Sequence, residues 1–285
     1  MRSHGEQERD QGVARRRGRL PHFAAIIEAM TTDAVCPKCE GTGFIIIERG
    51  GISGAEPCDC RAQGRTERLL ERSQIPALYQ KASFDNFAIP GPENPTARRE
   101  LTTVLLAVKN FVRDFKDDKR PGLLLIGNTG TGKTHLAVAA LRQIIEKGFE
   151  GLFYNYQNLL NSIKAGYDPS SNSSNREAYQ SALDAEVLLL DDLGAHRATD
   201  WVEDTVNSII TYRCDNRKPL LATTNMPDAD AGSVVVQKSG LDKPEYRRTL
   251  AEQIGGRARS RLFEMCTVIR MPLVEDYRVR KGKQF

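Results

Sequence analysis

A glycine-rich segment, residues 127–134, has the residue types and spacing that hold a polyphosphate. It follows an apolar run, precedes a helical pattern, and reads Gly127, Asn128, Thr129, Gly130, Thr131, Gly132, Lys133, Thr134. Glycines let backbone N–H groups curl around phosphate oxygens, and the start of a helix adds partial positive charge. The lysine of such a loop reaches the β- and γ-phosphates, and the threonine hydroxyl binds Mg²⁺. A glycine-rich turn that matches by chance is the alternative. The order of strand, loop, lysine, threonine and helix favours a site for a nucleoside triphosphate.

Two carboxylates end a second apolar run. Residues 187–190 predict a buried parallel strand, and Asp191 and Asp192 follow it. The C-terminal ends of such strands form the ligand-binding edge of an open α/β sheet. We expect Asp191 to hold Mg²⁺ through water and Asp192 to orient the attacking water. A solvent-facing acidic turn is the alternative, which the phosphate loop disfavours. A third predicted strand ends at Asn225, whose amide is a candidate to bind the same water or the γ-phosphate, although such residues often only cap a turn.

Four of the six cysteines lie within one short segment. Cys36 and Cys39 form a C-x-x-C pair, and Cys58 and Cys60 form a C-x-C pair after eighteen intervening residues. Two such pairs suit a tetrahedral Zn²⁺ held by four thiolates, and a predicted β-hairpin over residues 44–52 would bring the pairs together. Disulfides, which a reducing cytosol disfavours, and free buried thiols are the alternatives. A catalytic zinc would need a ligand position left open for water, so we expect structural zinc.

Length and composition set further bounds. The chain has 285 residues, a net charge of +4 and a pI near 8.7. This charge is too small to indicate nucleic-acid binding by itself. We expect neither a membrane span nor a signal peptide, and therefore a cytoplasmic protein without membrane partners. The expected segments are a disordered basic tail (1–30), a zinc-binding module (31–66), a helical linker (67–82) and a nucleotide-binding domain (83–285).

The motifs together resemble the AAA+ ATPases, and more narrowly the bacterial helicase loaders of the DnaC/DnaI type and the IstB-like transposition ATPases. The resemblance spans residues from about 83 to 278 and includes the phosphate loop, Asp-Asp-Leu-Gly at 191–194, Ala-Thr-Thr-Asn at 222–225 and the arginine-rich run at 256–266. The cysteine pairs resemble the zinc module of the DnaI branch. The resemblance implies an α/β fold, a P-loop AAA+ parallel sheet flanked by helices with a minimal lid, and ATP as the nucleotide.

The same resemblance assigns roles to single residues. Asp191 matches the Walker B metal residue, and Asn225 matches sensor 1. Arg261 matches an arginine finger, which acts on ATP bound by the neighbouring subunit, and Arg257 would assist it. Arg278 is a candidate sensor 2 residue, with almost no lid domain after it. A solvated basic helix face is the alternative for the arginines.

Two departures from the family pattern matter. AAA+ enzymes generally have glutamate where this chain has Asp192, and the shorter side chain predicts slow turnover, which suits a switch better than a motor. The segment 228–254 is longer than the usual link between sensor 1 and the arginine helix.

Lys164 and Tyr167 are candidates for single-stranded DNA contacts. The alternative is that their helix is an ordinary amphipathic helix that packs on the sheet.

We therefore expect an ATP-dependent loader of the replicative DNA helicase. It would bind single-stranded DNA, self-assemble through its ATP interfaces and dock the helicase through the zinc module. An IstB-like transposition helper is the closest alternative, and it typically lacks such a module. A small-molecule P-loop kinase would need an acceptor site and would not explain Arg261 together with Asn225. A nucleotide-binding scaffold without turnover is a further alternative.

Overall fold

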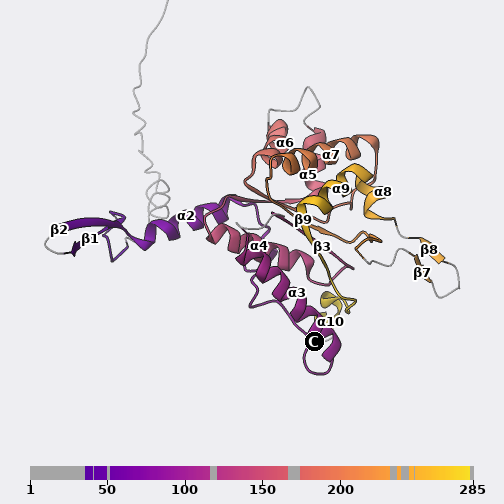
Figure 1. Ribbon diagram of the computed structural model, residues 1–285, viewed down its shortest axis with the longest axis horizontal. Coiled ribbons are helices and arrows are strands. Elements are labelled where there is room, and N and C mark those ends of the chain that lie inside the picture. Colours follow the sequence, from indigo (N-terminus) through magenta and orange to yellow (C-terminus); the bar gives the residue numbers. More distant parts are fainter. Residues whose placement is uncertain are drawn as a thin grey trace, which may run out of the picture. The chain divides into compact units, whose positions relative to one another are not determined.

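The computed structural model describes residues 36–40, 42–49, 52–115, 121–165, 174–231, 236–238, 244–246 and 248–282. Residues 1–61 and 62–285 form two compact units. In chain order the elements are β1 (Phe44–Arg49), β2 (Ile52–Pro57), α2 (Asp59–Arg72), the 3₁₀ helix η1 (Ala77–Tyr79), α3 (Pro95–Arg113), β3 (Gly122–Ile126), α4 (Lys133–Glu146), β4 (Gly151–Asn155), α5 (Tyr156–Ala165), α6 (Ser174–Asp184), β5 (Val187–Asp191), α7 (Asp200–Asp215), β6 (Leu220–Thr224), β7 (Val236–Lys238), β8 (Pro244–Tyr246), α8 (Leu250–Ile254), α9 (Gly256–Met265), β9 (Cys266–Arg270) and α10 (Tyr277–Gly282) (Figure 1).

A five-stranded parallel sheet forms the centre of the unit 62–285. Its strand order is β4-β5-β6-β3-β9, and every pair of neighbours is parallel. The C-terminal ends of β3, β5 and β6 therefore lie along one edge of the sheet. Ligands bind at this edge in open α/β sheets, where the strand order reverses.

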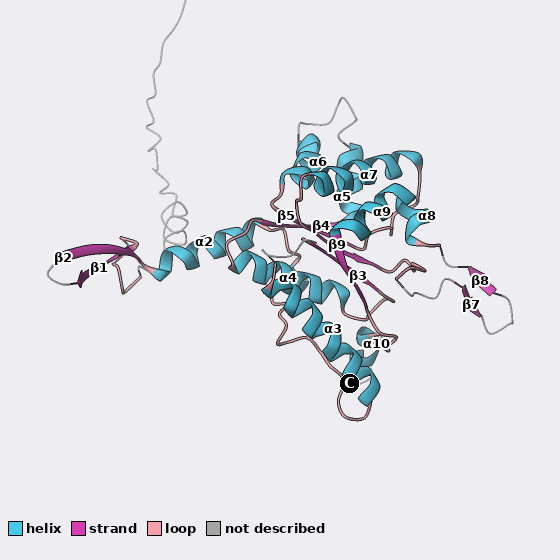
Figure 2. Ribbon diagram, viewed as in Figure 1, coloured by secondary structure: helices cyan, strands magenta, loops and turns pink. Residues whose placement is uncertain are grey.

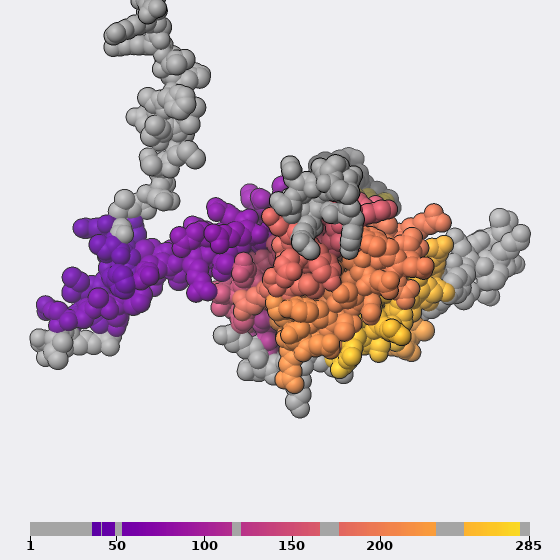
Figure 3. Space-filling model, turned by 90° about the horizontal axis from the view of Figure 1, so that it is seen from above, coloured from indigo at the N-terminus to yellow at the C-terminus, as the bar shows by residue number. Residues whose placement is uncertain are grey.

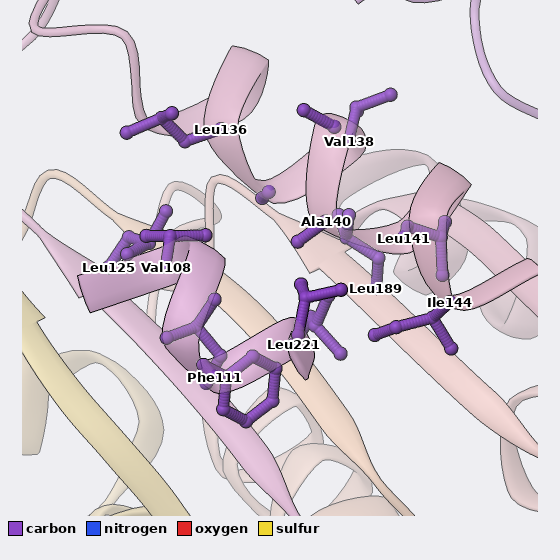
Figure 4. Packing of buried hydrophobic residues seen from close by; sticks show 14 of the residues in the cluster. Val108, Phe111, Leu125, Leu136, Val138, Ala140, Leu141, Ile144, Leu189 and Leu221 are labelled. Atoms are coloured by element: carbon purple, nitrogen blue, oxygen red, sulfur yellow. The ribbon is translucent and has the colours of Figure 1, made fainter. Parts of the chain in front are cut away.

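Helices cover both faces of this sheet (Figure 2). Alternate residues of β3 belong to opposite faces: Leu123 and Leu125 pack in the core with α3 and α4, whereas Leu124 and Ile126 pack in the core with α5, α7 and α9. Figure 4 shows the first of these cores, where the α3 and α4 side chains meet those of the sheet. Strand β3 is buried along its whole length. A strand covered on both faces has no polar alternation, which explains the continuous apolar run at 123–126.

A buried arginine joins α6, α7 and the start of β6. Arg213 of α7 has no exposed surface. Its two terminal nitrogens donate hydrogen bonds to the carbonyls of Ala182, Leu183, Ala185, Glu186 and Pro219. The first two carbonyls lie in the last turn of α6, where the helix dipole is negative and carbonyls lack helical partners. Burial lowers the pKa of Arg213 to about 10, so it remains a cation at neutral pH.

The unit 1–61 contains the expected hairpin. β1 and β2 pair antiparallel, with Phe44 opposite Pro57 and Arg49 opposite Ile52. Cys39 and Cys58 therefore lie at the same open end of the hairpin, and the N–H of Cys58 donates to the carbonyl of Gly43 at 2.8 Å. Residues 50–51, the expected Gly-Gly turn, lie outside the described residues.

The expected fold class is confirmed: the chain has an α/β fold with a parallel sheet flanked by helices. The division of the chain at residues 30, 66 and 82 stays a prediction, and α2 runs across the second of these boundaries. The tail 1–30, Tyr167 and parts of the segment 228–254 lie outside the described residues. None of the helices in the described part of the chain is long and apolar enough to cross a membrane.

We expect Arg213→Met to lower the free energy of unfolding by about 3 kcal/mol or more, because buried carbonyls would lose their donor. Chemical denaturation of the two proteins measures this difference. Lys218→Met is the matched control, since Lys218 donates one exposed hydrogen bond to the carbonyl of Asp184; we expect a cost of less than about 1 kcal/mol. Equal costs for the two substitutions would contradict the structural role of Arg213.

Candidate nucleotide-binding site

The loop between β3 and α4 depends on glycine at two positions. Gly130 and Gly132 have φ angles of +74° and +91°, a left-handed conformation that glycine adopts without strain. A Cβ at Gly130 would lie 2.0 Å from the Asp276 carboxylate, and a Cβ at Gly132 would lie 2.6 Å from the Phe87 ring. The chain therefore turns sharply into α4 without side chains at these two positions, which is the geometry that directs backbone N–H groups at an anion.

Lys133, the first residue of α4, is held inside this site. It is 6% exposed, and its Nζ donates to the carbonyl of Asn128 at 2.8 Å and to Asn225 Oδ1 at 2.6 Å. Burial lowers the pKa of Lys133 to about 8, although the nearby carboxylates of Asp192 and Asp191 oppose this shift. The ammonium group is thus incompletely compensated. A triphosphate would supply the missing negative charge.

Asp191 ends β5 and lies beside the start of α4. Its Oδ1 accepts hydrogen bonds from Thr134 Oγ1 at 2.8 Å and from Thr223 Oγ1 at 2.7 Å. Burial raises the pKa of this carboxyl, and the two threonine hydroxyls oppose the shift. A carboxylate and a hydroxyl in contact at the end of a phosphate loop are the ligands that a nucleotide-bound Mg²⁺ uses. This chemistry fits Mg²⁺ at Thr134 and Asp191, as the sequence predicts.

Asp192 and Asn225 are joined directly. Asn225 Nδ2 donates to Asp192 Oδ1 at 2.5 Å, while its Oδ1 accepts from Lys133. Asp192 has a φ of +63°, a strained conformation for a residue with a side chain. Its N–H donates to Thr223 Oγ1 at 2.9 Å. The amide of Asn225 therefore connects the phosphate-binding lysine to the carboxylate expected to orient water.

A cavity of about 710 Å³ contains these groups. Its polar lining includes residues 129–134, Asp191, Asp192 and Asn225. Its apolar lining includes Leu78, Tyr79, Phe87, Pro90, Leu101 and Val274. A cavity with both kinds of lining suits a purine base joined to a triphosphate. The segment Ser83–Phe87 contributes Asn86 and Phe87 to this lining and contacts α4, because the carbonyl of Ser83 lies 2.9 Å from His135 Nε2.

The C-terminal part of the described chain completes the cavity. The N–H of Tyr277 donates to the carbonyl of Gly130 at 3.1 Å, and Glu275, Tyr277 and Arg278 line the cavity. From this segment the sequence assigned a role to Arg278 alone, and by resemblance only. The contact of Tyr277 with the phosphate loop was missed, as was the role of Thr223, which lies two residues before Asn225 and has no local pattern that marks it as a partner of Asp191.

Arg261 is placed elsewhere. It lies on α9, is 42% exposed, and contacts Glu264 at 2.9 Å and Asp215 of α7 at 3.9 Å. In the space-filling view α7 (orange) and the yellow residues that include α9 form adjoining surface (Figure 3). Among the described residues that line the cavity, Arg278 is present and Arg261 is not. The structure therefore brings residues 129–134, Asp191, Asp192 and Asn225 together in one cavity, whereas Arg257 and Arg261 are not among the described residues that line it.

The four cysteines of the unit 1–61 form a separate candidate site. Their Sγ atoms all lie within 4.8 Å of one another. The Sγ distances are 3.8 Å for Cys36 to Cys58 and 3.4 Å for Cys39 to Cys60. Thiolates around a tetrahedral Zn²⁺ at about 2.3 Å lie about 3.8 Å apart, whereas a disulfide needs about 2.05 Å. The spacing of the four sulfur atoms therefore fits a zinc ion, and these two sulfur–sulfur distances are too long for disulfide bonds.

Local backbone groups support the same conclusion. The N–H of Gly43 donates to Cys39 Sγ at 3.3 Å. Hydrogen bonding to Cys39 raises the pKa of Cys60 to about 12. The Cys60 thiol would therefore keep its proton at neutral pH until a cation such as Zn²⁺ displaced it.

The affinity for MgATP is expected to fall above pH 8. Lys133 must be charged to bind phosphate, and its pKa of about 8 in the free protein means that binding requires proton uptake at higher pH. The affinity should fall by up to about tenfold per pH unit. The terminal phosphate, with a second pKa near 6, is already ionised there. Calorimetric titration in buffers of different ionisation enthalpy measures the uptake, and an affinity unchanged from pH 7 to 9.5 would contradict it.

Purified, reduced protein is expected to carry about one zinc per chain. Cys36→Ser combined with Cys39→Ser should remove the metal, because two of four ligands are lost, while MgATP affinity stays unchanged. Elemental analysis and ATP titration provide the measurements. Cys214→Ser is the matched control, since Cys214 lies outside the four-cysteine group and its removal should leave zinc content unchanged. Wild-type protein without zinc would refute the assignment.

Comparisons with known proteins agree with this geometry. The family model described as IstB-like ATP binding protein matches residues 55–241. The phage-like element PBSX protein XkdC of Bacillus subtilis is 29% identical over 223 residues, 74% of this chain and 79% of that protein. The replicative helicase loader DnaC of Escherichia coli K12 is 24% identical over 184 residues, 64% of this chain and 71% of that protein.

A solved structure shows the same relationship. The crystal structure of the DnaC helicase loader superposes with a TM-score of 0.54 and 29% identity, over 69% of this chain and 100% of that chain. The matched family segment contains the phosphate loop, both aspartates of 191–192 and Asn225. The chain therefore belongs to the IstB-like ATP-binding protein family and is an AAA+ protein related to the DnaC helicase loaders.

Proposed function

We propose that this protein is an ATP-hydrolysing switch that loads the replicative DNA helicase in the cytoplasm. The observation that carries the proposal is that most of the expected catalytic groups lie together in the cavity, while Arg261 lies outside it. Lys133, Asp192 and Asn225 form one hydrogen-bonded set, and Arg261 lies on α9 outside the cavity lining. Arginine fingers act on the nucleotide of a neighbouring chain, and the position of Arg261 outside the lining of its own cavity supports this role.

In this mechanism Thr134 and Asp191 would hold Mg²⁺, and Lys133 would bind the β- and γ-phosphates. Mg²⁺ would neutralise charge that develops on the phosphates. Asp192 orients the attacking water, and Asn225 fixes that carboxylate. Arg261 of a neighbouring chain would stabilise the transition state, so hydrolysis would require assembly. Aspartate at 192 is shorter than glutamate, which supports slow turnover and a switch.

The similarity to DnaC supports a helicase and single-stranded DNA as partners. The four-cysteine module supports the same function, since it provides a second compact unit for protein docking. Lys164, exposed at the end of α5, remains a candidate DNA contact. A transposition helper of the IstB type is the alternative outcome of the test below.

The loading test uses the replicative helicase of the same organism and closed circular single-stranded DNA. With MgATP, the protein should place the ring-shaped helicase on the circle, as measured by co-sedimentation of helicase with DNA. Lys133→Ala should abolish loading because it removes the phosphate-binding cation. Arg261→Ala should bind ATP normally, yet hydrolyse it at least about a thousandfold more slowly, the scale of arginine fingers.

Mixed subunits provide the control. A mixture of Arg261→Ala with Lys133→Ala chains contains interfaces in which an intact cavity faces an intact Arg261, so ATPase activity should partly return. The absence of recovery in assembled mixtures would exclude the proposed trans mechanism. Normal ATPase activity combined with binding to a transposase and not to the helicase would favour the alternative function.

A further inference from the structure

The loop after β6 is tied to α8 and α9 at two points. The carbonyl of Pro227 accepts a hydrogen bond from the N–H of Leu250, the first residue of α8, at 3.0 Å. One residue further, Asp228 forms a bidentate pair with Arg259 of α9: Nε to Oδ2 at 2.8 Å and a terminal nitrogen to Oδ1 at 2.7 Å. This loop starts at Asn225, the residue that bridges Lys133 and Asp192. A short, hydrogen-bonded path therefore joins the nucleotide cavity to α9.

The pair is held more firmly than a surface ion pair. The side chain of Asp228 is 4% exposed and that of Arg259 is 21% exposed. Asp230 adds a third contact at 2.5 Å, and the guanidinium lies 4.1 Å from the centre of the Phe263 ring. Burial disfavours the charged carboxylate of Asp228, but the hydrogen bonds from Arg259 outweigh it and lower its pKa. Two-point geometry and partial burial make such a pair rigid as well as attractive.

Helix periodicity separates Arg259 from its arginine neighbours. Residues four apart on a helix lie about 40° apart around the axis, whereas residues two apart lie about 200° apart. Arg257 and Arg261 therefore share one face of α9, and Arg259 lies on the opposite face, towards the loop. Since Arg259 is outside the cavity lining, it cannot act on the nucleotide of its own chain. It can act by fixing the orientation of the helix.

We propose that Asp228 and Arg259 are positioning residues that couple α9 to the nucleotide state of the same chain. Binding of a triphosphate draws Lys133 away from Asn225, and the change at the end of β6 passes through Asp228 to Arg259. The face that carries Arg257 and Arg261 is then set for the neighbouring subunit. This inference rests on the proposed ATP-switch function, and it explains how an occupied cavity would report to the next interface.

Hydrogen–deuterium exchange of the full chain tests the coupling. A non-hydrolysable ATP analogue with Mg²⁺ is added at concentrations where the protein is monomeric. In the wild type we expect slower exchange both in residues 127–134 and in residues 256–265, by about fivefold or more in the latter, the lower range of allosteric coupling. In Arg259→Met and in Asp228→Asn, protection of 127–134 should persist while that of 256–265 is lost. Assembled Arg259→Met protein should show a lowered kcat with an unchanged KM for ATP.

Arg113→Met provides the matched control. Arg113 also forms a bidentate pair with an aspartate, Asp114, but that pair is exposed and lies at the end of α3. This variant should retain both responses to nucleotide. If nucleotide does not slow exchange of residues 256–265 in the wild type, or slows it equally in Arg259→Met, the proposed coupling is refuted while nucleotide binding stands. A wild type in which residues 127–134 do not respond would overturn nucleotide binding itself, and with it the proposed function.

Discussion

The nucleotide site is organised around one partly buried cation. Lys133 is placed at the start of α4 by the glycine loop, and it stays charged because oxygen atoms of that loop and of two other segments compensate its charge. The carbonyl of Asn128, the amide of Asn225 and the carboxylates of Asp191 and Asp192 all contribute. A buried ammonium group without such partners would lose its proton. The order of strands in the sheet is therefore constrained by electrostatics at its C-terminal edge as well as by packing.

The sheet could be predicted because its signals are local. The apolar runs before Gly127 and Asp191 specify buried strands, and a glycine loop between strand and helix specifies the crossover. Parallel strands then place their C-terminal ends together without further information. This reasoning located the phosphate loop, the two aspartates and Asn225. It also gave the cysteine hairpin, since two close pairs separated by a strand-like run have few ways to meet.

The remaining features depend on contacts between residues far apart in the chain, and no local pattern reports them. Thr223 has the spacing of an ordinary strand residue, yet its hydroxyl contacts both Asp191 and the backbone of Asp192. Arg259 is one of three alternate arginines in a run that reads as a basic helix face, and only the fold shows that it faces Asp228. Arg213 likewise gives no sign in the sequence that its charge is buried among carbonyls.

Gly130 illustrates how two distant segments restrict each other. The phosphate-loop pattern requires glycine at positions 127 and 132 but accepts other residues at 130. In this chain the Asp276 carboxylate lies where a side chain at 130 would begin, and the backbone there is left-handed. A side chain at 130 would have to displace the Asp276 carboxylate, and it would also hold a left-handed backbone under strain. Gly130 therefore meets two constraints at once: the left-handed turn of the phosphate loop, and the close approach of the C-terminal segment, whose Tyr277 N–H donates to its carbonyl.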